Sequence, residues 1–299
     1  MHSDPCESLR RQGYQFFSPH STAAVKPCLW CIRALKGGEM CYKHQFYGIE
    51  SHRCVQMTPT LRCNQRCLFC WRSFEHEVEE ESECTPEEIL AGVARLQLKG
   101  LAGYKVSPDV TAERFDQAVH PKHIAISLAG EPTGYSRLPE LIDLFCAEQY
   151  TTFLVSNGTR PWVLQKCRPY QLYISLDAPN EAIYRRLCQP KGDYWELVQE
   201  SLSLLGRQRS AIRITLVAGI NDTDPAGYAA MIADAAPTYV EVKGYMYLGS
   251  SRNRLQQGHM PDHQKVRGFA EQIARYAGYT IKDEHPGSRV VCMERADEI

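Results

Sequence analysis

The chain has 299 residues, of which 43% are hydrophobic and 23% charged, and its formal net charge at pH 7 is -1. This length suffices for one large α/β domain or two small ones, with a core that needs no disulfides. A net charge so close to zero neither supports nor excludes a nucleic-acid partner. Because the opening residues 1–5 are polar and no apolar run is long enough to span a bilayer, we expect a cytoplasmic protein with reduced thiols and no membrane association.

The N-terminal part of the chain is set apart by its cysteines. The chain has 13 cysteines, and Cys28, Cys41 and Cys54 follow one another with twelve residues in each gap. The residues alone leave two interpretations open. One is a second metal site in a wrapped N-terminal loop, and the other is a zinc ion held by Cys28, Cys31, Cys41 and His44.

Charge is distributed unevenly along the chain. Residues 1–72 contain ten Lys and Arg against four Asp and Glu, a net charge of +6, whereas residues 73–90 contain eight Glu and no Lys or Arg. Residues 1–27 of the basic part are expected to form a polar arm with one short helix. A basic segment that carries cysteines suits a polyanionic partner, and a solvated surface with uneven charge explains the same pattern equally well.

From Val55 onwards the pattern alternates between strands and helices. The expected strands are 55–61, 123–128, 152–156, 172–176, 212–217 and 239–242. The expected helices between them are 86–98, 138–149, 180–187, 194–205 and 227–235. A helix at 262–276 and a strand at 289–293 follow. Six strands alternating with helices predict an α/β fold with a parallel sheet, and residues 74–121 read as an insertion after the first strand.

The loop after the first expected strand carries the strongest motif in the chain. Cys63, Cys67 and Cys70 stand in the order C-x3-C-x2-C. Thiolates at such short spacing hold iron–sulfur clusters, and three of them leave one iron of a four-iron cluster open for a substrate or cofactor. A structural zinc ion would take a fourth ligand of matching type. Phe69 would shield one side of the cluster.

The later strands run into polar or glycine-rich segments, one after another. These segments are 129–132, 156–159, 175–179, 218–222 and 243–245. In parallel α/β folds, ligands gather at the carboxyl ends of the strands. Five such endings in succession, on the same edge as the cysteine loop, predict a binding site there.

The cysteine loop resembles the signature of the radical S-adenosylmethionine (SAM) superfamily, C-x3-C-x-aromatic-C. The resemblance implies a partial (β/α)6 TIM-like barrel and a [4Fe-4S] cluster whose open iron chelates SAM, which is cleaved to a 5′-deoxyadenosyl radical. Gly130, Glu131 and Pro132 match the motif that holds the amino group of SAM, with Ala129 in place of its first glycine. The other positions that match cofactor-binding residues of the superfamily are Ser156, Asn157, Ser175, Asp177 and Asn221.

A narrower resemblance runs from Cys28 to the C-terminus. The C-x12-C-x12-C spacing, the segment 241–245 and the pair Arg252 and Arg254 are similar to the archaeal-type tRNA 4-demethylwyosine synthase family. Membership implies that two carbons of pyruvate are joined to N1-methylguanosine at position 37 of phenylalanine tRNA, after hydrogen abstraction from the N-methyl group. It also implies a second, auxiliary [4Fe-4S] cluster on Cys28, Cys41 and Cys54.

Two lysines are candidates for catalysis. Lys43 matches the lysine that is proposed in this family to form a Schiff base with pyruvate, although its sequence context alone suits a solvated lysine. Lys243 follows the sixth expected strand and would bind the carboxylate of pyruvate or assist proton transfer.

The resemblance also implies partners and a division of the chain. We expect residues 1–54 to form an N-terminal extension with the auxiliary ligands and residues 55–299 to form the radical SAM core with the C-terminal substrate-binding elements. A monomer is expected, with an external electron donor such as a flavodoxin or ferredoxin. The tRNA needs cationic and stacking contacts, and the residues predicted to bind it are Arg62, Arg66, Arg72, Tyr245, Arg252 and Arg254.

Two other functions fit part of the sequence. One is a radical SAM enzyme with an auxiliary cluster that acts on a peptide or small molecule. Such enzymes often carry extra cysteines after the barrel, where this chain has only Cys292, so the sequence disfavours this function. The other is a zinc-bound RNA-binding module without catalytic activity, which would be colourless and contain zinc in place of iron.

Overall fold

The computed structural model describes residues 5–74 and 82–296. The chain divides into two compact units, each of which is described by itself. Unit 1 comprises residues 1–63, 75–155 and 166–170, and unit 2 comprises residues 64–74, 156–165 and 171–299. Residues 75–81, which carry five of the eight glutamates of the acidic stretch, lie outside the described residues.

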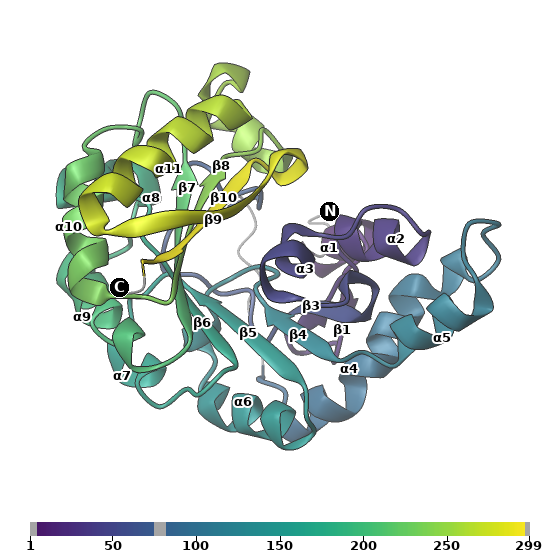
Figure 1. Cartoon of the computed structure of the whole chain (residues 1–299). Helices are drawn as coiled ribbons and strands as arrows, with labels where there is room; N and C mark the ends of the chain where they lie inside the picture. The colour runs from purple at the N-terminus through teal and green to yellow at the C-terminus, as the bar shows by residue number, and fades with distance from the viewer. Residues whose placement is uncertain (1–4, 75–81, 297–299) are drawn as a thin grey trace. The chain divides into compact units, whose positions relative to one another are not determined.

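Unit 1 is built on five strands that neighbour one another in chain order (Figure 1). The strands are β1 (Gln15–Phe16), β2 (Ala24–Val25), β3 (Cys54–Thr58), β4 (His123–Ile126) and β5 (Thr151–Ser156). Strand β2 pairs antiparallel with β1 and with β3. Strand β4 pairs parallel with β3 and with β5. The parallel part therefore begins at Cys54, and its first strand runs towards the cysteine loop.

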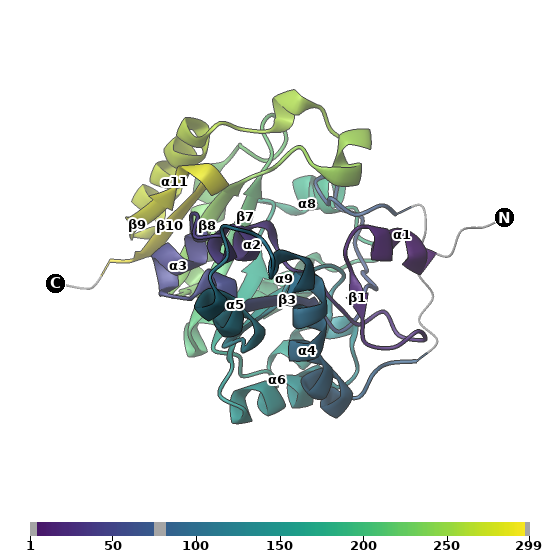
Figure 2. The ribbon, with the colours of Figure 1, turned by 90° about the vertical axis from the view of Figure 1, so that its right-hand side faces the viewer.

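The helices of unit 1 are α1 (Pro5–Arg11), α2 (Leu29–Leu35), α3 (Tyr42–Tyr47), α4 (Pro86–Leu101), α5 (Ala112–Val119) and α6 (Leu138–Ala147). The longest, α4, begins with a capping box in which the side chains of Thr85 and Glu88 each accept a hydrogen bond from the other's backbone N–H. Ile89, Val93 and Leu96 form its buried side. This side packs against β1–β3 and α6 (Figure 2).

Unit 2 contains three parallel strands followed by an antiparallel pair. The order of its strands is β6 (Gln171–Ser175), β7 (Ser210–Leu216), β8 (Tyr239–Gly244), β10 (Val290–Arg295) and β9 (Tyr279–His285). The helices are α7 (Pro161–Leu164), α8 (Glu181–Cys188), α9 (Trp195–Leu202), α10 (Pro225–Ala235) and α11 (His263–Ala277). In Figure 1, α11 lies along β8, β9 and β10, which it contacts through its buried side, where Val266, Phe269 and Ile273 lie.

The strands and helices predicted from Val55 onwards are confirmed, with ends that shift by up to about three residues. Among the described residues, no helix combines the length and the apolar character needed to cross a bilayer.

The N-terminal arm is where the prediction was incomplete. Residues 1–27 were expected to hold one short helix, and α1 is that helix, but β1 and β2 also join the sheet and Tyr14, Ala24 and Val25 are buried. Strands of two residues are too short to show an alternating pattern. The sequence also missed β9, whose segment Lys282–Glu284 is charged, and α5, which buries only Phe115 and Ala118.

Candidate active site

Cys28, Cys41 and Cys54 each stand at the start of a secondary-structure element of unit 1. Cys28 is the N-cap of α2, and its sulfur accepts a hydrogen bond from the backbone N–H of Cys31 at 3.3 Å. Cys41 is the N-cap of α3, where its backbone N–H donates to Ser51 Oγ at 2.9 Å and that hydroxyl donates back to its sulfur at 3.2 Å. Cys54 is the first residue of β3. Helix starts and a strand start thus set the positions of the three sulfur atoms.

The three thiols and the ammonium group of Lys43 lie close enough to interact electrostatically. Burial is the main reason that the pKa of Cys54 is raised, the charge of Cys28 raises it further, and Lys43 acts in the opposite direction. Burial likewise raises the pKa of Cys28, against the effects of its backbone hydrogen bond and of Lys43. A metal or cluster bound here has to displace thiol protons, as metal sites of cysteine generally do.

Lys43 is buried although it is a lysine. The residue is 7% exposed, and Nζ lies 4.6 Å from the centroid of the Phe153 ring. Phe153 in turn contacts the rings of Tyr47 and Tyr170, with centroid distances of 6.4 Å and 5.8 Å. Burial rules out the alternative of a solvated lysine, and the amine lies over the Phe153 ring and within electrostatic reach of Cys28 and Cys54.

The geometry does not favour a zinc ion on Cys28, Cys31, Cys41 and His44. Cys31 is fully buried, and its sulfur accepts a hydrogen bond from Gln97 Nε2 at 3.5 Å. His44 Nδ1 hydrogen bonds to the backbone oxygen of Ile49 at 2.7 Å. Among the described residues, no group of three or more His, Cys, Asp or Glu is arranged to hold one metal ion. A cluster spreads its thiolates over several irons, so they need not converge on a single point.

Gly130 and Glu131 support the start of the cysteine loop in unit 1. Gly130 has a φ of +76°, and a Cβ there would lie 2.2 Å from the backbone oxygen of Thr60. Glu131 donates its backbone N–H to Arg62 O at 2.7 Å, and its buried carboxylate accepts from Thr133 N and Oγ1. Only glycine fits this approach, so the motif predicted to bind SAM also fixes the backbone that leads into Cys63.

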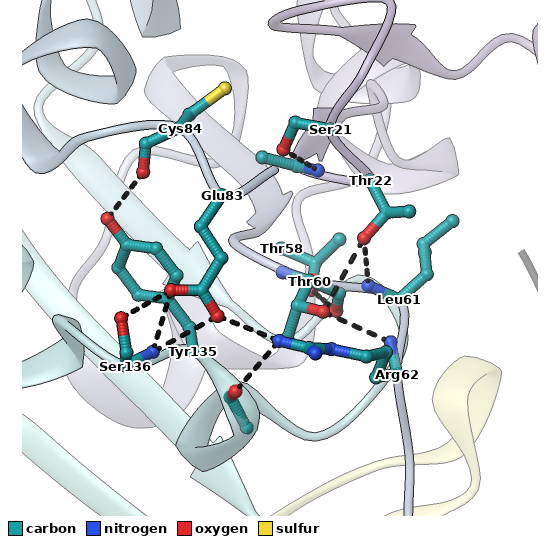
Figure 3. Close-up of polar contacts among 12 residues, drawn as sticks. Ser21, Thr22, Thr58, Thr60, Leu61, Arg62, Glu83, Cys84, Tyr135 and Ser136 are labelled. Atoms are coloured by element: carbon teal, nitrogen blue, oxygen red, sulfur yellow. Dashed lines mark hydrogen bonds and ion pairs between the residues drawn. The ribbon is translucent and has the colours of Figure 1, made fainter. Parts of the chain in front are cut away.

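Arg62, which directly precedes Cys63, is already paired within unit 1. Arg62 donates to the carboxylate of Glu83 at 2.7 Å (Figure 3), and it also donates to Gly134 O at 3.3 Å. The same carboxylate accepts from the backbone N–H and the hydroxyl of Ser136. Half of the Arg62 side chain remains exposed, so its predicted contact with tRNA stays a prediction.

The cysteine motif continues in unit 2, where residues 64–74 begin with Asn64. Its side chain joins the carboxyl end of β5: Asn157 Nδ2 donates to Asn64 Oδ1, and Asn64 Nδ2 donates to Thr159 Oγ1, both at 2.8 Å. Ser156 Oγ accepts from Gly158 N at 3.1 Å. Asn64 and Thr159 were not among the predicted site residues, although Asn64 lies inside the motif itself.

The middle of the loop rests on the end of α8. Arg66 N donates to the backbone oxygens of Cys188 and Gln189, and Leu68 N donates to Leu187 O at 2.8 Å. Cys67 is close to Cys188, and a hydrogen bond between the two thiols, followed by burial, raises the pKa of Cys67 well above the ordinary value. Phe69 packs on an apolar cluster that includes Leu187, Val217, Ile220 and Tyr245.

The end of the loop is held by Arg254. Its guanidinium donates to the backbone oxygens of Leu68 (3.2 Å), Cys70 and Arg72 (3.2 Å). Gly249 and Ser250 support the adjacent residue Trp71, whose oxygen accepts from Ser250 N at 2.9 Å.

The other residues predicted to contact tRNA near this loop have varied surroundings. Tyr245 is buried and its hydroxyl hydrogen bonds to Ser251 Oγ at 2.8 Å, whereas the exposed Arg252 donates to Tyr247 O. Arg66 is exposed and Arg72 is half-buried.

Asp177 and Asn221 connect the ends of β6 and β7. Asp177 Oδ1 accepts from Thr215 N at 2.6 Å, and Asn221 Nδ2 donates to the backbone oxygens of Asp177 and Thr215. Burial raises the pKa of Asp177 to about 6, against the hydrogen bonds from Thr215 and the charge of Arg213. Ser175 at the end of β6 is half-buried.

One face of β6, β7 and β8 carries a buried polar cluster that the sequence analysis missed. Arg213 donates to Glu241 Oε2 from Nε at 3.1 Å and from Nη2 at 2.8 Å, and Tyr173 donates to Glu241 Oε1 at 3.1 Å. Lys243 lies on the same face and donates to Ser288 O at 2.8 Å. Burial, and then the charge of Arg213, lower the pKa of Lys243 to about 8. Polar residues at alternate positions of β7 and β8 were the available signal.

The structure thus brings the predicted residues together in groups within each unit. Unit 1 joins Cys28, Cys41, Cys54 and Lys43, and it places Gly130 and Glu131 against the backbone before Cys63. Unit 2 holds the loop with Cys67 and Cys70 next to Asn157 and gathers Asp177, Asn221 and Lys243 at strand ends.

Known proteins match nearly the whole chain. The model of the radical SAM superfamily matches residues 57–232, and the model of wyosine base formation matches residues 234–295. The S-adenosyl-L-methionine-dependent tRNA 4-demethylwyosine synthase of Pyrococcus abyssi is 42% identical over 302 residues, which cover 97% of this chain and 88% of that protein.

Solved structures agree with these matches. One, described as TYW1 with a lysine–pyruvate adduct bound, has a TM-score of 0.90 and 37% identity, and the similarity covers 99% of this chain and 96% of that one. A crystal structure of archaeal TYW1 has a TM-score of 0.82 and 33% identity over the same shares. The expected α/β radical SAM fold with its partial TIM-like barrel is therefore confirmed, and the chain belongs to the family of S-adenosyl-L-methionine-dependent tRNA 4-demethylwyosine synthases.

Proposed function

We propose that this protein converts N1-methylguanosine at position 37 of phenylalanine tRNA to 4-demethylwyosine, with pyruvate as the source of two carbons. The observation that carries the proposal is the burial of Lys43 among Cys28, Cys41, Cys54 and Phe153. A lysine–pyruvate adduct is described for a structure that is 37% identical to this chain. A lysine amine that is buried next to the proposed cluster ligands is a suitable nucleophile for such an adduct.

The residues fit the groups that the radical SAM family implies. Cys63, Cys67 and Cys70 would hold the [4Fe-4S] cluster, and Phe69, Gly130, Glu131, Pro132, Ser156, Asn157, Ser175, Asp177 and Asn221 would line the SAM site. When bound, the cluster and SAM together supply the carbon radical that takes a hydrogen atom from the N-methyl group. Asn64, Arg254 and the end of α8 hold the loop in place for this chemistry.

Cys28, Cys41 and Cys54 are proposed to hold an auxiliary [4Fe-4S] cluster. Three partly exposed thiols that interact with one another suit such a group. Cys31 is left out, because it is fully buried in an apolar cluster with Leu35 and Leu101.

Lys43 is proposed as the nucleophile towards pyruvate. Its neutral amine would attack the C2 carbonyl, and loss of water would leave an imine in place of the ketone. The aromatic rings beside Lys43 would limit the access of water, which hydrolyses an imine. Lys243 is proposed to bind the substrate carboxylate or move a proton, since a pKa of about 8 allows both protonation states near neutral pH.

The proposed partners are phenylalanine tRNA, pyruvate and an external electron donor such as a flavodoxin or ferredoxin, and the protein is proposed to act as a monomer. The exposed or half-exposed residues Arg62, Arg66, Arg72 and Arg252 suit phosphate contacts. Arg254 and Tyr245 are largely engaged with the protein itself.

The test is anaerobic incubation of the reconstituted protein with SAM, dithionite, pyruvate and N1-methylguanosine-containing tRNA, followed by mass spectrometry of the nucleosides. We expect the tricyclic nucleoside to form. Formation of 5′-deoxyadenosine without that product would overturn the substrate assignment and keep the radical SAM assignment.

The lysine assignment has its own test, which needs no turnover. Borohydride added with pyruvate should attach a reduced pyruvate group to the peptide that contains Lys43. Lys43→Arg keeps the positive charge and should abolish the adduct, whereas Lys243→Met should at most lower its yield, because it removes a proposed contact to the carboxylate and not the nucleophile. An adduct mapped to Lys243 would overturn the assignment.

A further inference from the structure

A basic and aromatic surface of unit 1 has no part in the site described so far. Trp30, Arg33 and Lys36 come from α2 and its C-cap, Tyr104 and Lys105 from the turn after α4, and Arg114 from α5. We call these six residues the α2–α5 surface. Helices α2 and α5 contact each other in unit 1 (Figure 2). Arg33, Lys36 and Lys105 are exposed.

The elements that carry this surface share one apolar core. Leu35 of α2, Leu101 of α4 and Phe115 of α5 are buried together, with Tyr104 packed against them. Cys28 and Cys31 belong to the same cluster. The backbone segments that carry the six residues are therefore fixed relative to one another and to Cys28.

The cations of the α2–α5 surface lie over aromatic rings. The guanidinium of Arg33 lies 5.0 Å from the Trp30 ring, and the ammonium groups of Lys36 and Lys105 lie 5.4 Å and 6.0 Å from the rings of Tyr104 and Phe115. Within the described residues, these cations form no ion pair with a carboxylate. Arg185, Arg267 and Lys282, in contrast, are each paired with one. Their charge is thus available to an external anion.

The nearby acidic side chains of α5 have other partners. Glu113 accepts a hydrogen bond from Gln117, and Asp116 pairs with His120. Neither of them forms an ion pair with Arg33, Lys36 or Lys105 among the described residues.

A surface pocket lies beside Arg33 and Lys36 of the α2–α5 surface. Its volume is about 330 Å³, and Arg33, Lys36, Gly38 and Glu39 line it. Gly37 has a φ of +79°, and a Cβ there would lie 2.7 Å from Arg114 Nη1. The absence of a side chain at Gly37 leaves room for the Arg114 guanidinium beside this loop. Glu39 adds an acceptor of the kind that bonds to the exocyclic amino group of a base.

We propose that the α2–α5 surface binds the sugar–phosphate backbone of the tRNA substrate. This inference rests on the proposed function. Cations that form no ion pair with a carboxylate suit phosphates, and aromatic rings beside them suit unpaired bases. The seven residues of α2 extend about 10 Å, so an RNA strand on this surface passes close to the helix end at Cys28 and near Lys43.

The test is the salt dependence of tRNA binding, measured by fluorescence anisotropy with labelled tRNA and full-length reconstituted protein. The variant Arg33→Gln/Lys36→Gln/Lys105→Gln should raise Kd by about tenfold or more at about 0.1 M salt. The slope of log K against log salt should become shallower by about 2, because each lost phosphate contact removes about 0.7–0.9.

Two further variants isolate the effect. Arg185→Gln/Arg267→Gln/Lys282→Gln removes the same charge from exposed, ion-paired cations and should change Kd by about twofold or less. Arg33→Lys/Lys36→Arg/Lys105→Arg keeps the charge and should restore both affinity and slope. An unchanged Kd and slope in the first variant would overturn the inference.

Failure of the inference is separable from failure of the proposed function. Wild-type protein that makes the tricyclic nucleoside, together with a triple Gln variant that binds tRNA normally, would reject only the surface. SAM cleavage without tRNA should be equal in wild type and variant, which shows that the fold and the cluster are intact.

Discussion

Gly130 is the residue whose replacement should have the clearest structural effect. Alanine there would combine a positive φ with a Cβ 2.2 Å from Thr60 O, which is backbone and cannot turn aside. We expect Gly130→Ala to lower the free energy of unfolding by about 2–4 kcal/mol, and to lower the iron content, because residues 60–62 must move. Urea titration and an iron assay measure the two effects.

Gly278 supplies the matched control. It has a φ of +73° at the C-cap of α11, and among the described residues no atom lies within 4 Å of the place that a Cβ would take. Gly278→Ala should therefore cost only the backbone strain, about 1 kcal/mol. Equal losses for the two substitutions would contradict the argument from close approach.

Lys243 should give unfolding a pH dependence of known sign. Its pKa in the folded protein, about 8, lies below the ordinary 10.5. Between these values the unfolded chain binds more protons, so the free energy of unfolding of wild type should rise with pH relative to Lys243→Met. Below a pH of about 8 the lysine is charged in both states, and the cost of burying it is constant.

The size of this effect should be about 1–3 kcal/mol between about pH 7.5 and about pH 10. Urea titrations of wild type and Lys243→Met at both pH values measure it. Other groups titrate equally in both proteins, so the difference reports Lys243 alone. If the difference in the free energy of unfolding between the two proteins does not change with pH, the pKa of Lys243 is not lowered in the folded protein.

At the residue scale, the sequence could identify side chains by motif but not their neighbours. The cysteines, Gly130 and Asn157 stand in recognisable spacings. The partners Asn64, Glu83 and Glu241 are 93, 21 and 28 residues from Asn157, Arg62 and Arg213. No local pattern encodes contacts at such separations.

The loop of residues 64–74 is an element without regular structure that several segments hold in place. Arg254→Ala removes three hydrogen bonds to its backbone oxygens, and we expect a loss of about 2–4 kcal/mol of stability. We also expect weaker retention of iron and slower SAM cleavage. Both are measured after reconstitution and gel filtration.

Arg252→Ala is the control for Arg254. Arg252 is exposed, and its Nε donates to the backbone oxygen of Tyr247, which lies outside the loop of residues 64–74. Its replacement should preserve iron and SAM cleavage, and it should weaken tRNA binding if Arg252 contacts a phosphate. Equal iron loss in both variants would show that the clamp by Arg254 is not what retains the cluster.

At the element scale, prediction succeeded where burial is periodic. The helix α11 and the parallel strands β6–β8 have apolar residues at regular spacing, and their ends were predicted closely. The strands β1 and β2 are two residues long, and β9 is mostly polar, so their pairing depends on neighbours that the local sequence does not show.

For the whole molecule, the proposal of two clusters predicts how iron is divided. Wild type should hold about eight irons per chain, about four in each cluster. Replacing Cys28, Cys41 and Cys54 by Ala should leave about four, with SAM cleavage intact and no tricyclic product. Replacing Cys63, Cys67 and Cys70 by Ala should also leave about four but abolish SAM cleavage.

Cys31→Ala is the control for these variants, because Cys31 lies in the apolar cluster next to Cys28. It should keep about eight irons. A loss of iron in Cys31→Ala equal to that in the triple variant of Cys28, Cys41 and Cys54 would make Cys31 a ligand and contradict the proposed set.

The hydrogen bonds from Arg254 to the loop have a consequence for biosynthesis. The nitrogen and oxygen atoms of the bond to Leu68 belong to residues 186 positions apart. At about 5–20 residues per second, a ribosome takes roughly 10–40 s to reach Arg254 after it has made Leu68. During that interval Cys67 and Cys70 are free thiols on a nascent chain without their clamp. Cluster insertion is therefore expected to follow translation. Oxygen that reaches the chain during this interval can oxidise the two thiols before the enzyme has any activity.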